Sequence, residues 1–206
     1  MTPRFRSFVL ALAASAANGD WRIVPGERVG PVYAASSSDT LRAILGASSL
    51  VDKEIHIGEG VTEPGTVLWE NDPSRALAIL WKDPARRQGV ERIFICYGLT
   101  SGPCRWRLDG GITYGTSLRA LEKMNGRPFT LLGFGWDYSG TVSSWRGGSL
   151  ERLNRNGRVL VRLTPRPGLV PGRELSGDRE ILSTNRDMQR LDPVIYHLVV
   201  EMGARQ

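Results

Sequence analysis

The sequence predicts an α+β protein with a mainly antiparallel sheet and two short helices. Short apolar segments follow one another through turns rich in Gly, Pro and Asn, and such short connections favour antiparallel pairing. Two other segments carry serine caps and apolar stripes at helical spacing. Of the 206 residues, 41% are hydrophobic and 23% are charged, which is typical of a folded domain rather than a disordered chain.

Residues 1–16 have the features of a bacterial secretory signal peptide. Arg4 and Arg6 give a basic start, an apolar run begins at Phe8, and Ala14-Ser15-Ala16 fits the small-x-small cleavage rule. The apolar run is too short to span a bilayer. We therefore expect a periplasmic or secreted protein without a transmembrane segment. The alternative for this segment is a buried N-terminal helix.

In the first half of the chain, the patterns predict one helix between groups of short strands. Strands are expected at 21–24 and 28–33. Ser36 to Asp39 supply a cap and an acid in the first helical turn, and Gly46 ends the helix. Further strands are expected at 54–57, 66–69, 77–81 and 92–97.

The second half repeats this order. Residues 116–121 (TSLRAL) parallel residues 39–44 (DTLRAI), and Gly126 ends the second helix. Strands are expected at 129–134, 141–145, 158–163 and 194–200, with a loop rich in Pro and Gly at 165–177. We therefore expect two related α+β units, 17–105 and 106–206, packed as one globular body. A chance match of two short segments is the alternative.

Cys96 and Cys104 flank a segment in which Gly98, Gly102 and Pro103 favour a tight reversal. In an oxidising compartment this arrangement predicts a disulfide that closes a hairpin. A buried free pair and a metal site are the alternatives. The metal site lacks further ligands, because the sequence has only two histidines and no C-x-x-C pair. We expect no metal.

The most distinctive polar and aromatic cluster is Trp136-Asp137-Tyr138. With Trp145 and Arg146 it would form a shallow platform on which a sugar ring or a peptide stacks, since aromatic rings combine a large apolar face with a polar edge. The alternative is structural. In that case Trp136 and Trp145 pack under the second helix, and Asp137 fixes the hairpin by accepting backbone N–H groups.

His56 and Glu59 are weaker candidates, because they lie at a glycine turn that follows a strand. A His–carboxylate pair can act as base and orienting group, and Glu59 with Asp137 has the residue types of a glycosidase pair. No G-x-S-x-G nucleophile turn accompanies them. The alternative is an alternating strand with Glu59 in its turn. No residue is assigned as catalytic.

Charge and glycine spacing exclude two other classes of site. The 27 Lys and Arg residues exceed the 21 Asp and Glu residues, but they are spread along the chain. A nucleic-acid site would gather them on one face, so none is expected. The glycines match neither G-x-x-x-x-G-K-[ST] nor G-x-G-x-x-G in its strand-to-helix setting, so no nucleotide cofactor is expected.

The second helix and its surroundings resemble those of small exported bacterial domains. A strand ending in glycine leads into Thr-Ser-Leu and a helix closed by Asn-Gly-x-Pro-Phe. This order resembles the BamE-like outer-membrane assembly lipoproteins and the β-lactamase inhibitory proteins, of which the latter are tandem repeats. The matching positions are Gly115, Thr116, Leu118, Leu121, Gly126 and Pro128. The lipid-attachment cysteine of the BamE-like proteins has no counterpart here, so an outer-membrane anchor is not expected.

Three further segments are similar to a family of bacterial secreted or periplasmic proteins with no assigned activity: 28–32 (RVGPV), 58–60 (GEG) and 133–140 (GFGWDYSG). Together the resemblances imply a protein-binding or envelope-maintenance role. We expect an exported soluble protein that is a non-catalytic binding or cell-envelope-associated protein, with another envelope protein or a glycan as partner.

The alternative is a hydrolase or a carbohydrate-binding protein that uses the 58–60 and 136–138 loops. The two hypotheses predict different surfaces. An enzyme would bring His56, Glu59 and Asp137 into one cleft with perturbed pKa values. A protein-binding surface would expose aromatic side chains without convergent acids.

Overall fold

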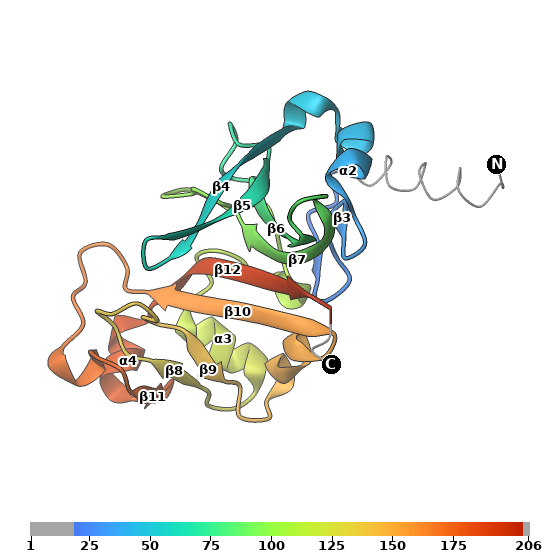
Figure 1. Cartoon of the computed structure of the whole chain (residues 1–206). Helices are drawn as coiled ribbons and strands as arrows, with labels where there is room; N and C mark the ends of the chain where they lie inside the picture. The colour runs from blue at the N-terminus through green and yellow to red at the C-terminus, as the bar shows by residue number, and fades with distance from the viewer. Residues whose placement is uncertain (1–18, 204–206) are drawn as a thin grey trace.

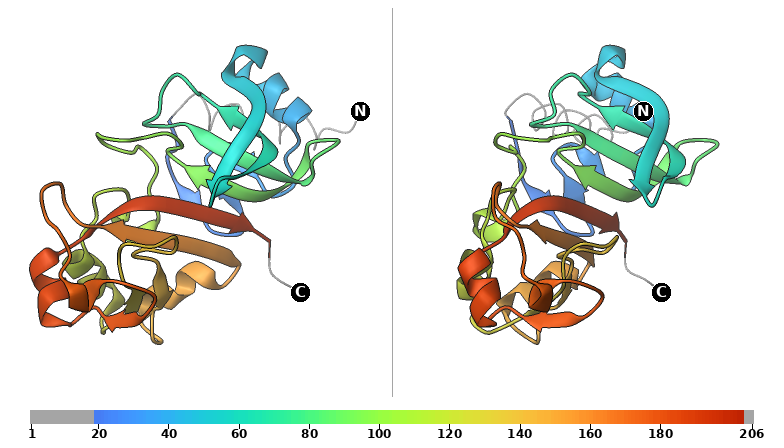
Figure 2. Two further views of the ribbon diagram at one scale, coloured as in Figure 1. Left: turned by 60° about the vertical axis from the view of Figure 1, so that its left-hand side comes forward. Right: turned by 90° about the vertical axis from the view of Figure 1, so that its left-hand side faces the viewer.

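A six-stranded antiparallel sheet is the centre of the molecule (Figures 1 and 2). The computed structural model describes residues 19–203, and the expected signal peptide at 1–16 lies outside them. The strands lie in the order β10-β12-β7-β6-β5-β4. Their bounds are Leu50–Gly58 (β4), Val61–Leu68 (β5), Leu77–Asp83 (β6), Gln88–Ile95 (β7), Gly157–Thr164 (β10) and Val194–Met202 (β12). The α+β class with mainly antiparallel strands is therefore confirmed.

Two small sheets and several short helices surround the large sheet. One small sheet has the order β1-β2-β3 and the other β11-β8-β9. Their strands are Ile23–Val24 (β1), Arg28–Val29 (β2), Val32–Tyr33 (β3), Thr130–Leu132 (β8), Val142–Ser144 (β9) and Glu180–Leu182 (β11). The α-helices are Ser38–Leu45 (α2), Leu118–Asn125 (α3) and Arg186–Leu191 (α4). Short 3-10 helices are Ala47–Ser49 (η1), Asp109–Gly111 (η2), Ser149–Asn154 (η3) and Arg173–Leu175 (η4). Within residues 19–203, no helix has the length and apolar character needed to cross a membrane.

The expected helices are α2 and α3, but other elements differ from the prediction. The strand expected at 28–33 is two strands, because Gly30 takes a left-handed conformation with φ 52° and turns the chain between β2 and β3. The loop expected at 165–177 contains η4. The sequence prediction has no counterpart for α4 or β11. Both are too short for a periodic signal, and β11 depends on its pairing with β8.

The two expected helices are docked in the same way. Ser37 caps α2 and Ser117 caps α3, each through its side-chain oxygen. The first N–H of α2 donates to the carbonyl of Arg87, directly before β7, and the first N–H of α3 donates to that of Pro193, directly before β12. Related units would show such matching contacts, and the internal repeat itself stays a prediction.

The two faces of the large sheet are buried in different ways. One face forms the main core, in which Ile93 and Leu198 pack with residues of α3 and the small sheets, Leu121 and Leu131 among them. The opposite face carries a second, smaller apolar cluster, formed by Ile55, Val67, Ala78, Leu80, Phe94 and Val199. Part of the sheet must therefore fold over its own second face, because these side chains are almost fully buried.

The β4–β5 hairpin provides this cover. β5 pairs with β6 only from Gly65 onward, so the outer half of the hairpin is a two-stranded ribbon. Ile55 of this ribbon is fully buried in the second cluster, and the backbone N–H of His56 donates to the Tyr97 hydroxyl at 3.2 Å. Gly65 permits the bend, because a Cβ atom there would lie 2.5 Å from the carbonyl oxygen of Ile79.

Trp106 contacts segments of the N-terminal half that lie far apart in the sequence. Its indole N–H donates to the carbonyl oxygen of Arg75 at 2.9 Å. Its ring centroid lies 5.0 Å from that of Trp21 and 6.1 Å from that of Trp69. Gly30 leaves room for this ring, since a Cβ atom there would lie 2.7 Å from it. Trp106 is 1% exposed and acts as a packing centre for the N-terminal half.

The expected disulfide between Cys96 and Cys104 is present and lies just before Trp106. We predict that replacing both cysteines by serine lowers the free energy of unfolding by about 2–3 kcal/mol, because the bond closes a short loop of the unfolded chain. Urea unfolding followed by circular dichroism measures this change. Wild type treated with a reductant is the control and should show the same loss, whereas an unchanged unfolding free energy in both samples would contradict the prediction.

Candidate functional site

The glycine turn at the tip of the β4–β5 hairpin is explained by backbone geometry. Gly58 pairs with Val61, which leaves Glu59 and Gly60 as a two-residue loop with φ of 52° and 73°. Positive φ at both positions is what a tight type I′ hairpin requires. His56 and Glu59 both have exposed side chains. Among residues 19–203, no hydrogen bond or ion pair joins either of them to Asp137.

Trp136, Asp137 and Tyr138 lie in the loop between β8 and β9. Tyr138 is 47% exposed, and its ring meets that of Trp136 edge-on with centroids 5.3 Å apart. The indole N–H of Trp136 donates to the carbonyl oxygen of Gly133 at 3.0 Å. Arg162 of β10 places its guanidinium 5.6 Å from the Tyr138 ring centroid, and its Nη1 donates to the Asp137 carbonyl oxygen at 3.1 Å. The loop therefore presents an aromatic pair beside an arginine.

Trp145 does not share this surface, which corrects the five-residue platform expected from the sequence. Its side chain is 2% exposed and packs on Phe129 with ring centroids 5.1 Å apart. The buried Asn125 of α3 donates from Nδ2 to the Trp145 carbonyl oxygen at 2.9 Å. Trp145 thus belongs to the core, as the structural alternative proposed.

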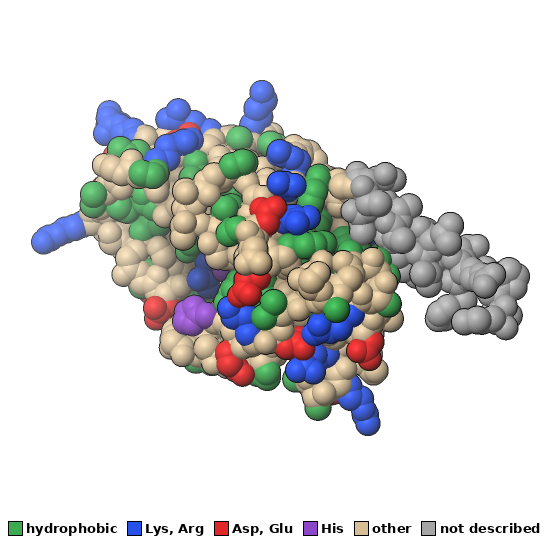
Figure 3. All heavy atoms as spheres, turned by 90° about the horizontal axis from the view of Figure 1, so that it is seen from above, with side chains coloured by type: hydrophobic (Ala, Val, Ile, Leu, Met, Phe, Trp, Pro, Cys, Tyr) green, Lys and Arg blue, Asp and Glu red, His purple; other side chains and the backbone are tan. Residues whose placement is uncertain are grey.

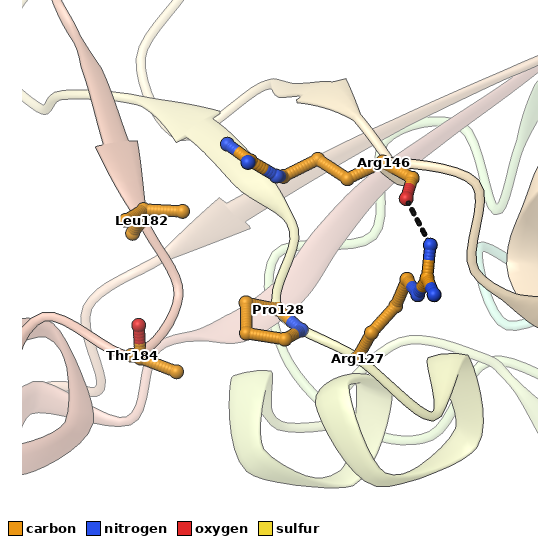
Figure 4. Close-up of a pocket in the computed structure, with 5 residues that line it drawn as sticks. All are labelled: Arg127, Pro128, Arg146, Leu182 and Thr184. Atoms are coloured by element: carbon orange, nitrogen blue, oxygen red, sulfur yellow. Dashed lines mark hydrogen bonds between the residues drawn. The ribbon is translucent and has the colours of Figure 1, made fainter.

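Arg146 lines a separate surface pocket of about 440 Å³ with Arg127, Pro128, Leu182 and Thr184. Figure 4 shows the Arg127 guanidinium directed at the backbone of Arg146, where its Nη1 donates to the carbonyl oxygen at 3.1 Å. The Arg146 side chain extends away from that contact, past Pro128 (Figure 4). Both arginines are exposed, so water already solvates their charges and the pocket gains little from binding an anion.

Arg162 is in a different electrostatic position from these exposed arginines. Its side chain is half-buried, and its Nε is buried without a hydrogen-bond partner. Within residues 19–203, no carboxylate lies within ion-pair distance of its guanidinium. Burying a cation is costly unless an anion or several acceptors compensate it. Among the described residues, Arg162 is therefore a half-buried cation without a counter-ion.

His197 of β12 lies directly across from Arg162 in the β10–β12 ladder. Its ring centroid is 6.0 Å from that of Phe94 and 6.0 Å from that of Tyr196. Burial, with a smaller contribution from the Arg162 charge, lowers the pKa of His197 to about 4. The imidazole is therefore neutral at pH 7 and leaves the positive charge to Arg162. We name the group formed by Trp136, Tyr138, Arg162 and His197 the Arg162 surface.

The surroundings of this group are partly apolar. Phe94 and Val199 belong to the second apolar cluster, on the sheet face beneath the β4–β5 hairpin. In the ribbon views, the tip of this hairpin and the β8–β9 loop both lie near the β10–β12 pair (Figures 1 and 2). Seen from above, the molecule has a hollow, with histidine and Lys or Arg side chains in and beside it (Figure 3).

Two aspartates of the described chain have carboxyl pKa values below the ordinary range. In the described part of the chain, no three His, Cys, Asp or Glu side chains are placed to hold a metal ion. A hydrogen bond from Arg22 lowers the pKa of Asp20 to about 2, and one from Ser74 lowers the pKa of Asp72. A general acid needs a raised carboxyl pKa. These two carboxylates are instead held ionised by their partners.

Comparison of the chain with protein-family models, with curated proteins and with solved structures finds no match. The resemblance to exported bacterial domains therefore stays an expectation. Function has to be inferred from the contacts and charges of this chain.

Sequence reasoning missed Arg162, although the strand that carries it is predicted. Alternation along β10 places Arg158, Leu160 and Arg162 on one face, and this pattern is visible in the sequence. The missing information is that a loop more than twenty residues earlier, with Tyr138, covers only one of these two arginines. That contact is tertiary and leaves no local signal.

Lowering the pH should destabilise the protein through His197. Because its folded-state pKa is about 4 and its ordinary value is 6.5, the unfolded chain binds the proton first as the pH falls. The contribution of the neutral, buried His197 to the free energy of unfolding is complete above about pH 6.5 and is lost as the pH falls towards 4. We expect the free energy of unfolding to decrease by up to about 3 kcal/mol over this interval.

Urea unfolding at about pH 7 and about pH 4.5 measures this effect. His197→Gln, which stays neutral, should remove much of the decrease, while His56→Gln at the exposed histidine should keep it. The same pH dependence in wild type and in His197→Gln would contradict the assignment to His197.

Proposed function

We propose that the protein is a non-catalytic binding protein of the bacterial cell envelope, and that the Arg162 surface binds an acidic segment of a protein partner. The observation that supports this most strongly is the half-buried Arg162 guanidinium, which has an aromatic ring beside it but, among residues 19–203, no carboxylate in ion-pair contact. A carboxylate of the partner would supply the missing counter-ion. A guanidinium suits this role because its planar fork binds a carboxylate through two parallel hydrogen bonds.

The neighbouring residues favour a peptide over a small inorganic anion. Tyr138 is 47% exposed and Trp136 half-buried, so a side chain of the partner can pack on their rings. Aromatic residues and arginine are the types that contribute most to protein interfaces. His197, neutral at pH 7, can exchange hydrogen bonds with a peptide without adding charge.

Export to the periplasm or the medium is part of this proposal. The signal-like segment at 1–16 and the disulfide between Cys96 and Cys104 support it, because disulfides persist in oxidising compartments. The hydrolase alternative has less support. Glu59 lies in a type I′ turn and Asp137 in an exposed loop, with no hydrogen bond or ion pair between them in the described chain.

Arg162→Gln should weaken the binding of an acidic peptide by about ten-fold or more, because it removes the charge and the fork but keeps a similar side-chain length. The probe is a hexaglutamate peptide, titrated by calorimetry at low ionic strength, with hexalysine as the peptide of opposite charge. Arg162→Lys keeps the charge and loses the fork, so it should bind with intermediate affinity.

Arg158→Gln is the matched control, because it removes the same charge from an exposed position of the same strand. We expect its affinity to stay within about two-fold of wild type. If Arg158→Gln and Arg162→Gln lose the same amount of affinity for hexaglutamate, net charge alone attracts the peptide, and the proposed site is contradicted. Failure of hexaglutamate to bind the wild type would contradict it as well.

A further inference from the structure

Two buried polar atoms without a hydrogen-bond partner lie opposite each other beside β10. Thr141, directly before β9, forms an antiparallel bridge with Arg162. Directly opposed residues of such a bridge have their side chains on the same face. Among residues 19–203, neither Oγ1 of Thr141 nor Nε of Arg162 has a hydrogen-bond partner. Because His197 lies across from Arg162 on the other side, Arg162 is the middle of three polar residues in a row.

Water does not reach these two atoms. Thr141 is 8% exposed, and neither its Oγ1 nor Nε of Arg162 has surface accessible to water. A buried polar atom without a partner makes folding less favourable, so nearly all such atoms in folded proteins are bonded. The buried Thr130 of β8 follows this rule, because its hydroxyl oxygen accepts a hydrogen bond from Ser143 at 2.8 Å. Thr141 and Arg162 are exceptions that a bound ligand would remove.

The contacts that Arg162 makes in this structure leave its Nε unused. Its Nη1 donates to the Asp137 carbonyl oxygen, and the Tyr138 ring lies 5.6 Å from the guanidinium carbon. A backbone carbonyl is a neutral acceptor and bonds to one nitrogen only. A carboxylate bonds to two guanidinium nitrogens at once and also carries the opposite charge. It is therefore the better partner for Arg162.

The middle of the β8–β9 loop can move away from Arg162 while the ends of the loop stay in place. At one end the indole N–H of Trp136 donates to a carbonyl oxygen next to β8, and at the other end the Gly140 carbonyl accepts from a backbone N–H of β10 at 2.9 Å. Between them, Asp137 and Tyr138 have exposed side chains. Among the described residues, their hydrogen bonds and ring contacts to β10 all go to Arg162. A ligand that replaces the Asp137 carbonyl on Arg162 therefore opens the way to the two unpartnered atoms.

We propose that Thr141 is a further carboxylate-binding residue of the Arg162 surface, reached when Asp137 and Tyr138 move aside. This inference rests on the acidic-peptide site proposed above. Nε and one Nη of Arg162 donate to the two oxygens of a Glu or Asp side chain of the partner, and the Thr141 hydroxyl donates to one of these oxygens. Both buried atoms then have the partner that they lack in the free protein. The hydroxyl of Thr141 thus contributes to binding and not to folding.

Thr141→Val tests this assignment, because it removes the hydroxyl and keeps the shape of the side chain. We expect its affinity for hexaglutamate, measured by calorimetry, to fall by about five-fold or more, since the carboxylate loses a hydrogen bond. Its midpoint in urea unfolding should be equal to or higher than that of wild type, because the folded chain loses no hydrogen bond. Thr141→Ser keeps the hydroxyl, so it should bind within about two-fold of wild type.

Thr130→Val is the matched control, because it removes a buried hydroxyl that has a partner in the same small sheet. This variant should unfold at lower urea and bind hexaglutamate like wild type. If Thr141→Val lowers the urea midpoint as much as Thr130→Val does, the Thr141 hydroxyl is already bonded in the folded protein, and the proposal is overturned.

A measurement on the wild type needs no folded Thr141 variant. The Nε–H signal of Arg162 in an NMR spectrum, assigned by its absence from Arg162→Lys, should shift when hexaglutamate binds. An unchanged signal at saturating peptide would overturn the proposal. If Arg162→Gln weakens binding and Thr141→Val does not, the role of Thr141 fails while the acidic-peptide site stands. If the wild type does not bind hexaglutamate, the acidic-peptide site fails and this inference fails with it.

Discussion

The insertion of the C-terminal strand between the two halves is the constraint on which the rest of the structure depends. β12 pairs along its length with β10, and through Val199, Val200 and Glu201 with β7. In the six-stranded sheet it joins the strands that precede α3 to the strand that follows it. Leu198 packs in the main core and Val199 in the second cluster, so β12 is buried on both faces. The large sheet is therefore complete only when β12, Val194–Met202, is in place.

The Arg162 surface depends on contacts between segments that are distant in the sequence. β12 holds His197 beside Arg162, and the β8–β9 loop adds Tyr138 to them. The N-terminal half depends in the same way on Trp106, which the disulfide precedes and against which Trp21 and Trp69 pack. Among residues 19–203, the guanidinium of the Arg162 surface has no carboxylate in ion-pair contact, so this surface suits an anionic group.

The features that could be predicted from the sequence are those that depend on near neighbours in the chain. The caps at Ser37 and Ser117, the alternation of β10 and the pairing of Cys96 with Cys104 all follow from local patterns. Others depend on which segments meet in space. A tryptophan is equally suited to a core and to a surface, so the burial of Trp145 and the exposure of the 136–138 loop could not be separated beforehand.

Amide hydrogen exchange along β7, β10 and β12 tests most directly whether the six-stranded sheet depends on β12. If β12 joins the halves into one cooperative body, its amides and those of β7 exchange only through global unfolding, at the free energy that urea unfolding reports. Exchange of β10 and β12 at a clearly lower free energy, while β4 to β7 stay protected, would mean that the halves unfold separately. That result would contradict the central role assigned here to the C-terminal strand.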